Sequence, residues 1–560
     1  MKSLPLFFLI GLFFGNISSY SQSKKIHIER SDYVDINESE VPGAVLLSGN
    51  VTIVHEGARM TCNKAYHFTK TNFIKAFGNV HLTQGDTVFM TSNYAEYNGD
   101  KKLAFAKGNV TVRDPQTTLV TDSLRFDRNK QEVYYESDGV IYEKENTLKS
   151  KVGRYYLKQK KYEFLTAVTL TNPKYVIKTN HLNYHTKNGD SYLLGPSTIK
   201  GKDNFIYTEK GIYNTKTNQA KLVKKSYIKY QNQLIQGDSL FYDRNKEFSS
   251  ATKNIKVTDS INRSVLKGDY GEVYRKKDSI YLTKRAVIIN RTETDSVYLH
   301  AKQFIVTGKP SQRIIKGFRN VRIFSTDVSG KCDSIHSKEQ IGLTKMIGNP
   351  VLWNKDSQLT GEVIHLIADK NTKQLDSLKI IGNAFMIQKD SLSDNAYNQV
   401  KGVYLYGKII DKKLNRVEVV KNAEVIFYVR DDKQELIGIN KSVSSKINMV
   451  LDKNTIETIT NYNQIDGDIY PEKDLPENAR KLRGFIWRGD ERIKSKDDIF
   501  PPEENELDAK IQAERKAEMD QDNKPLLPSK ETLDYDKNNP SPKAKADKKE
   551  KENGAKPKVQ

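Results

Sequence analysis

The sequence predicts an all-β fold in which short strands repeat along an elongated array. Strand-forming residues are abundant, because the 560 residues include 30 Tyr and aromatic side chains make up 9% of the chain. An aromatic or His side chain also recurs just before a polar turn at a nearly constant spacing. Each period contains two runs of alternating apolar and polar residues separated by turn residues, a pattern typical of strand–turn–strand units.

The repeat is defined by this aromatic or His marker. Five consecutive steps between markers are 29 residues long, and the other three are 30 or 32 residues. A fixed period in this range is typical of repeat architectures. The markers are His67, Tyr97, Phe126, Tyr155, Tyr184, Tyr213, Tyr242, Tyr274 and Phe304.

A glycine lies inside the long strand expected in each unit. Gly-Asn-Val occurs at Gly49, Gly78 and Gly108, and Gly-Asn recurs at Gly348 and Gly382. Glycine within a strand pattern indicates a bend or bulge. A strand that bends at the same place in every unit would fold the stacked sheet lengthwise into a V-shaped trough with one apolar face.

Residues 1–21 have the pattern of a secretory signal peptide. Lys2 supplies the positive start, Leu4–Phe14 is a short apolar run, and Ser19 and Ser21 are small residues suited to a cleavage site. The apolar run is too short to span a bilayer comfortably. We therefore expect an exported protein that is peripheral to the membrane at most.

The rest of the chain divides into four predicted segments. Residues 22–304 form a regular β-repeat domain and residues 305–470 a second, irregular one. Residues 471–500 form a closing segment rich in Pro, Trp and Arg. Residues 501–560 form a charged tail, which its composition predicts to be disordered, with a transient helix around Glu503–Met519 as the alternative.

The net charge of +21 predicts an anionic partner such as nucleic acid, a membrane surface or a phosphorylated lipid. The export signal argues against nucleic acid. Only two cysteines are present, Cys62 and Cys332, which excludes a disulfide-stapled scaffold and a Cys-rich zinc module.

Catalytic chemistry has little support in the sequence. His181 and His185 would share one face of a strand, but a third ligand is absent nearby, so ordinary strand histidines are the simpler interpretation. The stretch Gly195–Lys202 departs from a phosphate loop in its glycine spacing. We predict that the protein is not an enzyme and has no metal site, cofactor or catalytic residue.

The marker aromatics have two interpretations, which are compatible in an open trough. They form a packing ladder that holds successive strands in register, or they line an apolar groove for a lipid chain. The candidate lipid-binding residues are Tyr97, Phe126, Tyr155, Tyr184, Tyr213, Tyr242 and Tyr274.

Two recurring motifs resemble a known family. The pattern G-N-V-x-[IVL] occurs at Gly49–Ile53, Gly78–Leu82 and Gly108–Val112, and D-S-L-x-[FY]-x occurs at Asp122–Asp127 and Asp238–Asp243. In these motifs the chain resembles the OstA-like superfamily, which includes LptA, LptC and the N-terminal domain of LptD. The resemblance extends over residues 25–300 and, more loosely, over 300–470. The chain is much longer than a single-domain LptA and ends in a polar tail.

The resemblance implies an elongated OstA-like β-jellyroll (β-taco) repeat array whose open apolar groove holds acyl chains. It implies a periplasmic lipid carrier or bridge component that moves lipopolysaccharide toward the outer membrane, with basic rim residues meeting the phosphates of lipid A. The implied partners are lipopolysaccharide and other Lpt-type jellyroll proteins, joined by end-to-end strand addition.

Two alternatives remain from other functional classes. One is a structural or adhesive periplasmic β-repeat protein whose groove is filled by its own side chains. The other is an extracellular β-solenoid enzyme acting on acidic polysaccharide, which would need a cluster of Asp, Arg and Lys on one wall.

Overall fold

The computed structural model describes residues 25–522, with short gaps at 86–87, 293–294, 310, 355, 373, 391, 394 and 453–454. The predicted signal peptide (1–21) and the last part of the predicted tail (523–560) lie outside the described residues. The chain divides into two compact units, Met1–Ile499 and Phe500–Gln560, which are described separately.

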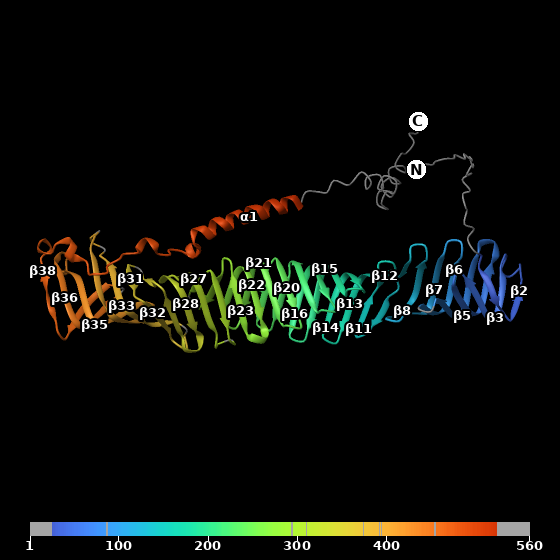
Figure 1. Cartoon of the computed structure of the whole chain (residues 1–560), viewed down its shortest axis with the longest axis horizontal. Helices are drawn as coiled ribbons and strands as arrows, with labels where there is room; N and C mark the ends of the chain where they lie inside the picture. Colours follow the sequence, from blue (N-terminus) through green and yellow to red (C-terminus); the bar gives the residue numbers. More distant parts are fainter. Residues whose placement is uncertain are drawn as a thin grey trace, which may run out of the picture. The chain divides into compact units, whose positions relative to one another are not determined.

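The described residues of the first unit form one sheet of 38 strands, and every pairing in it is antiparallel (Figure 1). The strands follow one another along the unit in chain order, because each pairs with strands close to it in the sequence. The first half comprises β1 (His27–Arg30), β2 (Tyr33–Asp35), β3 (Val45–His55), β4 (Ala58–Phe68), β5 (Phe73–Gln84), β6 (Val88–Asn98), β7 (Leu103–Arg113), β8 (Thr117–Asp127), β9 (Glu132–Tyr135), β10 (Gly139–Glu143), β11 (Asn146–Ser150), β12 (Val152–Tyr156), β13 (Lys161–Asn172), β14 (Tyr175–His185), β15 (Asp190–Gly201), β16 (Asn204–Asn214), β17 (Gln219–Lys224), β18 (Tyr227–Tyr230) and β19 (Gln233–Gln236).

The second half continues in the same order to the end of the sheet. It comprises β20 (Ser239–Asp243), β21 (Phe248–Asp259), β22 (Ser264–Tyr274), β23 (Ser279–Thr283), β24 (Val287–Arg291), β25 (Ser296–His300), β26 (Gln303–Thr307), β27 (Ile314–Phe324), β28 (Val328–Lys338), β29 (Leu343–Ile347), β30 (Val351–Asn354), β31 (Ser357–Thr360), β32 (Val363–Ala368), β33 (Leu375–Lys389), β34 (Tyr397–Ile410), β35 (Lys413–Arg430), β36 (Leu436–Asp452), β37 (Thr455–Tyr462) and β38 (Asp466–Tyr470).

The long strands bend at two consecutive residues with positive φ. In β3 these are Gly49 (φ 76°) and Asn50 (φ 47°), and the register with β4 shifts at the same point. Gly and Asn reach the left-handed region at low cost, which explains the Gly-Asn motif. The same bend occurs at Gly49–Asn50, Gly78–Asn79, Gly108–Asn109, Thr166–Ala167, Lys253–Asn254, Arg319–Asn320, Gly382–Asn383 and Lys421–Asn422.

The bends divide the sheet into two walls. Wall A carries the turns that follow β4, β6 and β8, and wall B carries the turns that follow β3, β5 and β7. Side chains of the two inner faces share one continuous hydrophobic core, which extends from Ile141 to Ile456. Smaller clusters occupy the N-terminal part of the sheet. This is the folded sheet with an apolar inner face that the sequence predicts.

The sheet continues without a break across residues 304 and 305, where a boundary between two repeat domains is expected from the sequence. β26 contains both residues and pairs with β23 on one side and β27 on the other. The regular repeats, the irregular repeats and the closing segment as far as Ile499 all belong to the first compact unit. The loss of the regular period after residue 304 is therefore not accompanied by a separate fold.

Residues 471–499 form an irregular strap that runs back along the outer face of wall B (Figure 1). Leu475 and Leu482 are buried there against outward-facing side chains of β33, β35 and β36. The strap is fixed by paired hydrogen bonds to Gln399, which accepts from the Leu482 N–H at 2.9 Å and donates to the Arg480 carbonyl at 2.8 Å. Its four short 3₁₀ turns are Glu472–Asp474, Glu477–Arg480, Gly489–Glu491 and Lys496–Ile499.

The described part of the second unit is the helix α1 (Pro502–Asp522). Glu503 and Glu504 lie in its first turn, where negative charge interacts favourably with the helix dipole. This helix covers Glu503–Met519, where the sequence offers a transient helix as the alternative to disorder. Among the described residues, no helix is long and apolar enough to cross a membrane.

Candidate functional site

The marker residues from His67 to Tyr242 form one continuous cross-strand row on the inner face of wall A, which we call the marker row. Each member lies directly opposite the next on the neighbouring strand. The row therefore places residues 29 positions apart in the sequence two strands apart in the sheet. Its members are Val45, His67, Ile74, Tyr97, Ala104, Phe126, Val133, Tyr155, Tyr162, Tyr184, Ser191, Tyr213, Ala220, Tyr242, Ser249, Val273, Ile280, Val306, Ile315, Ser337, Thr344 and Leu366.

Tyr274 is the one candidate lipid-binding residue that lies outside this row. Val273 occupies the row, and Tyr274 faces the outer side, with its ring 5.0 Å from Phe248 and its hydroxyl donating to Glu272 at 2.6 Å. A shift of one residue moves a side chain to the opposite face of a sheet. The 32-residue step that precedes Tyr274 in the sequence marks this shift.

The middle of the row is filled by the protein's own side chains. Tyr184, Tyr213 and Tyr242 are 5%, 0% and 3% exposed, and burial raises the pKa of each hydroxyl. Ser191 and Ala220 alternate with these tyrosines, and a small side chain leaves room for the neighbouring ring. Tyr97, Phe126 and Tyr155 are only partly buried.

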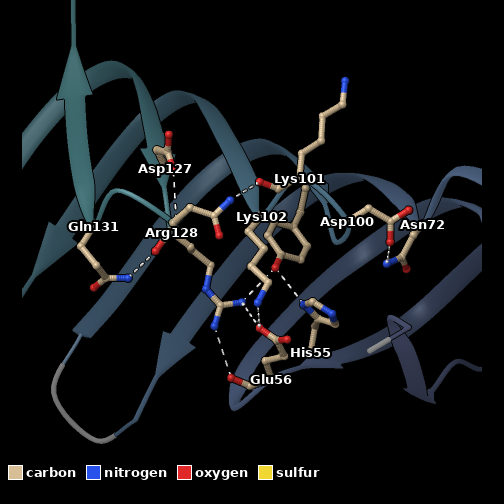
Figure 2. Close-up of polar contacts among 11 residues, drawn as sticks. His55, Glu56, Asn72, Asp100, Lys101, Lys102, Asp127, Arg128 and Gln131 are labelled. Carbon is tan, nitrogen blue, oxygen red and sulfur yellow. Dashed lines mark hydrogen bonds and ion pairs between the residues drawn. The ribbon is translucent and has the colours of Figure 1, made fainter. Parts of the chain in front are cut away.

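Side chains bridge the mouth between the two walls near the N-terminal end (Figure 2). Arg128, from a turn of wall A, donates to the Glu56 carbonyl at 3.3 Å and to the Tyr97 hydroxyl at 2.9 Å. The Tyr97 hydroxyl also lies 2.8 Å from Nδ1 of His55. The Lys102 ammonium lies 2.9 Å from the Glu56 carboxylate, and its hydrogen bond holds the pKa of that carboxyl below its usual range.

Similar bridges recur along the mouth as far as Arg313. Each joins an end of wall A to an end of wall B, so the mouth is crossed at intervals by polar contacts. The pairs are Tyr184 with Glu143 at 2.9 Å, Tyr242 with Asn204 at 2.6 Å, Arg244 with Asn204 at 3.4 Å, Arg275 with Gln233 at 3.5 Å, and Arg313 with Asp259.

Beyond Arg313 the inner faces separate and leave a cavity of about 260 Å³, which we call the lateral cleft. The marker row explains why it forms here. Ser337 and Thr344 are adjacent in the row, both are small, and their hydroxyls lie 2.8 Å apart. The apolar lining comes from both walls and includes Val297, Leu299, Ile315, Ile323, Leu366 and Ile409.

The rim of the lateral cleft is polar. Asp295 and Asp327 come from wall B, and Lys412 comes from a turn of wall A. The Asp295 carboxylate accepts hydrogen bonds from the backbone N–H and the hydroxyl of Thr326, at 3.1 and 3.0 Å. An apolar interior with a polar rim is suited to an amphipathic ligand whose hydrocarbon part enters the cleft.

The His pair singled out in the sequence lies on the outer face and does not converge on a common point. His181 lies 3.2 Å from Glu163, whereas the ring of His185 packs against Tyr192. Within the described ranges, no three His, Cys, Asp or Glu side chains are grouped so that they could hold a metal ion. Both cysteines are buried and free, and burial raises the pKa of the Cys62 thiol to about 11.

A comparison with protein families agrees with this geometry, since residues 23–180 match the model of the family described as OstA-like protein. This region of the chain is OstA-like. The bent strand pairs of the OstA-like region continue beyond residue 180, because β33 and β35 bend at Gly382–Asn383 and Lys421–Asn422.

Comparison with solved structures finds LptH of Pseudomonas aeruginosa, described as the LptA-homologous periplasmic component of the lipopolysaccharide transport device. LptH is 20% identical to this chain over 26% of the chain and 95% of LptH, with a TM-score of 0.20. No curated protein matches the chain.

The lateral cleft is the candidate functional feature that sequence reasoning missed. Its residues show the same alternation of apolar and polar positions as the filled part of the sheet. One signal could have located it. The row carries no aromatic side chain after Tyr242, and its positions at the cleft are Ser337 and Thr344.

Proposed function

We propose that the protein is a periplasmic lipid carrier or bridge component that moves lipopolysaccharide toward the outer membrane. The observation that carries this proposal is the lateral cleft, an apolar cavity that lies between the two walls of a folded sheet and has a polar rim. The OstA-like match over residues 23–180 supports it, as does the description of LptH as part of a lipopolysaccharide transport device.

The physical role of the cleft is to keep hydrocarbon out of water. Each buried methylene contributes roughly 0.8 kcal/mol, so a few methylenes in the cleft offset the cost of ordering an acyl chain. Lys412 at the rim is suited to a phosphate of the lipid headgroup. No catalytic step is needed for this role.

For part of the sheet, one observation favours the alternative function, that of a structural β-repeat protein. Leu182, Leu193, Ile199 and Ile206 are fully buried, so the groove between β13 and β16 is occupied by the protein itself. In this segment the sheet acts as a rigid spacer, as a structural repeat protein would. Our proposal therefore places the lipid in the lateral cleft and assigns a supporting role to the filled segment.

The partners proposed from the family resemblance would bind at the ends of the sheet. Among the described strands, β1 and β2 pair only with β3, and β37 and β38 pair only with β36. Their outer edges present backbone N–H and C=O groups to which another strand can add. We propose that other Lpt-type jellyrolls dock there end to end.

The test is to purify the exported protein and measure lipopolysaccharide that copurifies by mass spectrometry. In a Leu366→Trp variant the larger side chain fills the cleft, so we expect bound lipid to fall at least tenfold. The matched control is His365→Trp, one residue away on the outer face of the same strand, which should retain its lipid. Equal amounts of lipid in both variants, or no lipid in the unaltered protein, would contradict the proposal. The structural function, with a groove filled by the protein's own side chains, would then be the better explanation.

A further inference from the structure

A second hollow lies on the outer face of wall A, on the opposite side of the sheet from the groove. It has a volume of about 440 Å³, and we call it the outer hollow. Its floor is a cross-strand row that spans β6 to β12, in which each residue lies opposite the next. The row consists of Glu96, Phe105, Arg125, Tyr134 and Arg154, and Glu132 lines the hollow beside it.

Aromatic rings and guanidinium groups alternate along this row. The Arg125 guanidinium lies 5.7 Å from the ring centre of Phe105, and that of Arg154 lies 5.6 Å from the ring centre of Tyr134. These distances are in the range of cation–π contacts. A guanidinium that rests on a ring is held in position while its N–H donors remain directed to the side, where they can bind an anion.

The carboxylates of the outer hollow are recessed, whereas its cations reach solvent. The Glu132 side chain is 13% exposed and lies 2.9 Å from Arg154, which is 44% exposed. The Asp127 side chain is 16% exposed and accepts the backbone N–H of Lys130 at 3.0 Å, whereas the Lys130 side chain is 73% exposed. A ligand that enters the outer hollow therefore meets aromatic faces and positive charge first, with carboxylate oxygens behind them.

We propose that the outer hollow binds an acidic saccharide. The C–H face of a sugar ring would pack on Phe105 and Tyr134, and its carboxylate or phosphate would accept hydrogen bonds from Arg125 and Arg154. The recessed carboxylates favour a sugar over a nucleic acid, because they accept hydrogen bonds from hydroxyl groups and repel a continuous phosphate backbone. Glu132 is the carboxylate that accepts a hydrogen bond from a sugar hydroxyl at this site.

This proposal is independent of lipid binding in the lateral cleft. The outer hollow is lined by residues between Phe73 and Arg154, which face outward except for Ala104 and Phe126 of the marker row, whereas the lateral cleft is lined by residues from 290 onward. A variant in the outer hollow leaves the cleft unchanged, so the two proposals can fail separately.

The test is isothermal titration calorimetry on the purified full chain with four probes: tetragalacturonate, neutral maltotetraose, citrate and a tetrathymidylate. We expect tetragalacturonate to bind at least tenfold more tightly than each of the others. Arg154→Gln removes a hydrogen bond between charged groups, so it should weaken tetragalacturonate binding about tenfold or more. Tyr134→Leu should do the same through loss of the ring.

Matched controls are available on the same protein. Arg416→Gln and Tyr142→Leu change an exposed Arg and an exposed Tyr on other strands, and they should bind tetragalacturonate like the unaltered chain. Thermal melts of all four variants establish that they fold. Equal binding of citrate or tetrathymidylate, or equal affinity in the outer-hollow variants and their controls, would overturn the proposal.

Discussion

Breaking the ion pair between Arg313 and Asp259 should open the sheet locally where the bridged part of the mouth ends. The two side chains are 9% and 1% exposed. Removing one partner of a buried pair costs about 3–5 kcal/mol, because the remaining charge is left in a poorly solvated place. Asp259 keeps hydrogen bonds from Asn232 at 2.9 Å and from the backbone N–H of Asn262 at 3.1 Å. We therefore expect Arg313→Met to cost about 3 kcal/mol, the lower end of that range.

Hydrogen exchange followed by mass spectrometry is the appropriate assay, because a repeat sheet opens locally before it unfolds as a whole. A loss of about 3 kcal/mol corresponds to roughly 100-fold faster exchange of the protected amides in β21 and β27. Lys408→Met is the control, because its pair with Asp376 is 51% and 38% exposed and such pairs contribute little.

The double variant Arg313→Met with Asp259→Leu sharpens this test. Replacing both members of a buried pair by apolar residues is often nearly neutral, so exchange in β21 should return toward that of the unaltered chain. Unchanged exchange in Arg313→Met, or faster exchange in the double variant than in the single one, would refute the reasoning about the buried charge.

The same pair predicts a dependence on acid. Burial alone would raise the pKa of Asp259, but hydrogen bonds from the Asn262 backbone and the Arg313 side chain hold it below the unfolded value of 3.8. A group with a lowered pKa stabilises the fold above its unfolded pKa and loses that contribution as the pH falls through its folded pKa. Thermal melts below pH 3.8 should therefore decline more steeply for the unaltered chain than for Asp259→Asn.

Two further predictions concern the Gly348–Asn349 pair between β29 and β30 and the strap. Gly348→Ala should lower the melting temperature more than Gly43→Ala does. Both glycines have positive φ, but only at Gly348 would the new Cβ meet the Asp333 side chain, at 2.6 Å. Equal melting temperatures would contradict this. Leu482→Ala should cost about 2–5 kcal/mol of strap packing and make residues 471–499 sensitive to limited proteolysis, and an unchanged cleavage pattern would contradict burial of the strap.

The bends of the sheet are predictable from sequence where they use glycine. Gly-Asn at residues 49, 78 and 108 marks three of them, because a left-handed pair is cheapest there. Thr166–Ala167 and Lys253–Asn254 adopt the same conformation without glycine. At these positions the continuous pairing of the strands on both sides fixes a bend that local preference would not select.

The marker row is predictable as far as Tyr242 because each unit has the same length. The unit that contains β21 and β22 is longer than the preceding units, so Tyr274 falls outside the row. Only the strand register shows that Val273 occupies the row position. The lateral cleft is harder still to predict. It depends on how far the two walls stand apart. Ala220 and Ser337 are both small residues, but only Ala220 lies between two tyrosines in the row, and this difference is not visible in the sequence.

The most direct test of the central claim is photocrosslinking in cells, with a photoreactive residue placed either at Leu366, inside the lateral cleft, or at His365, on the outer face of the same strand. The account predicts lipopolysaccharide adducts at Leu366 and none at His365. Adducts at neither position, in protein that is folded and exported, would contradict a lipid-carrying cleft.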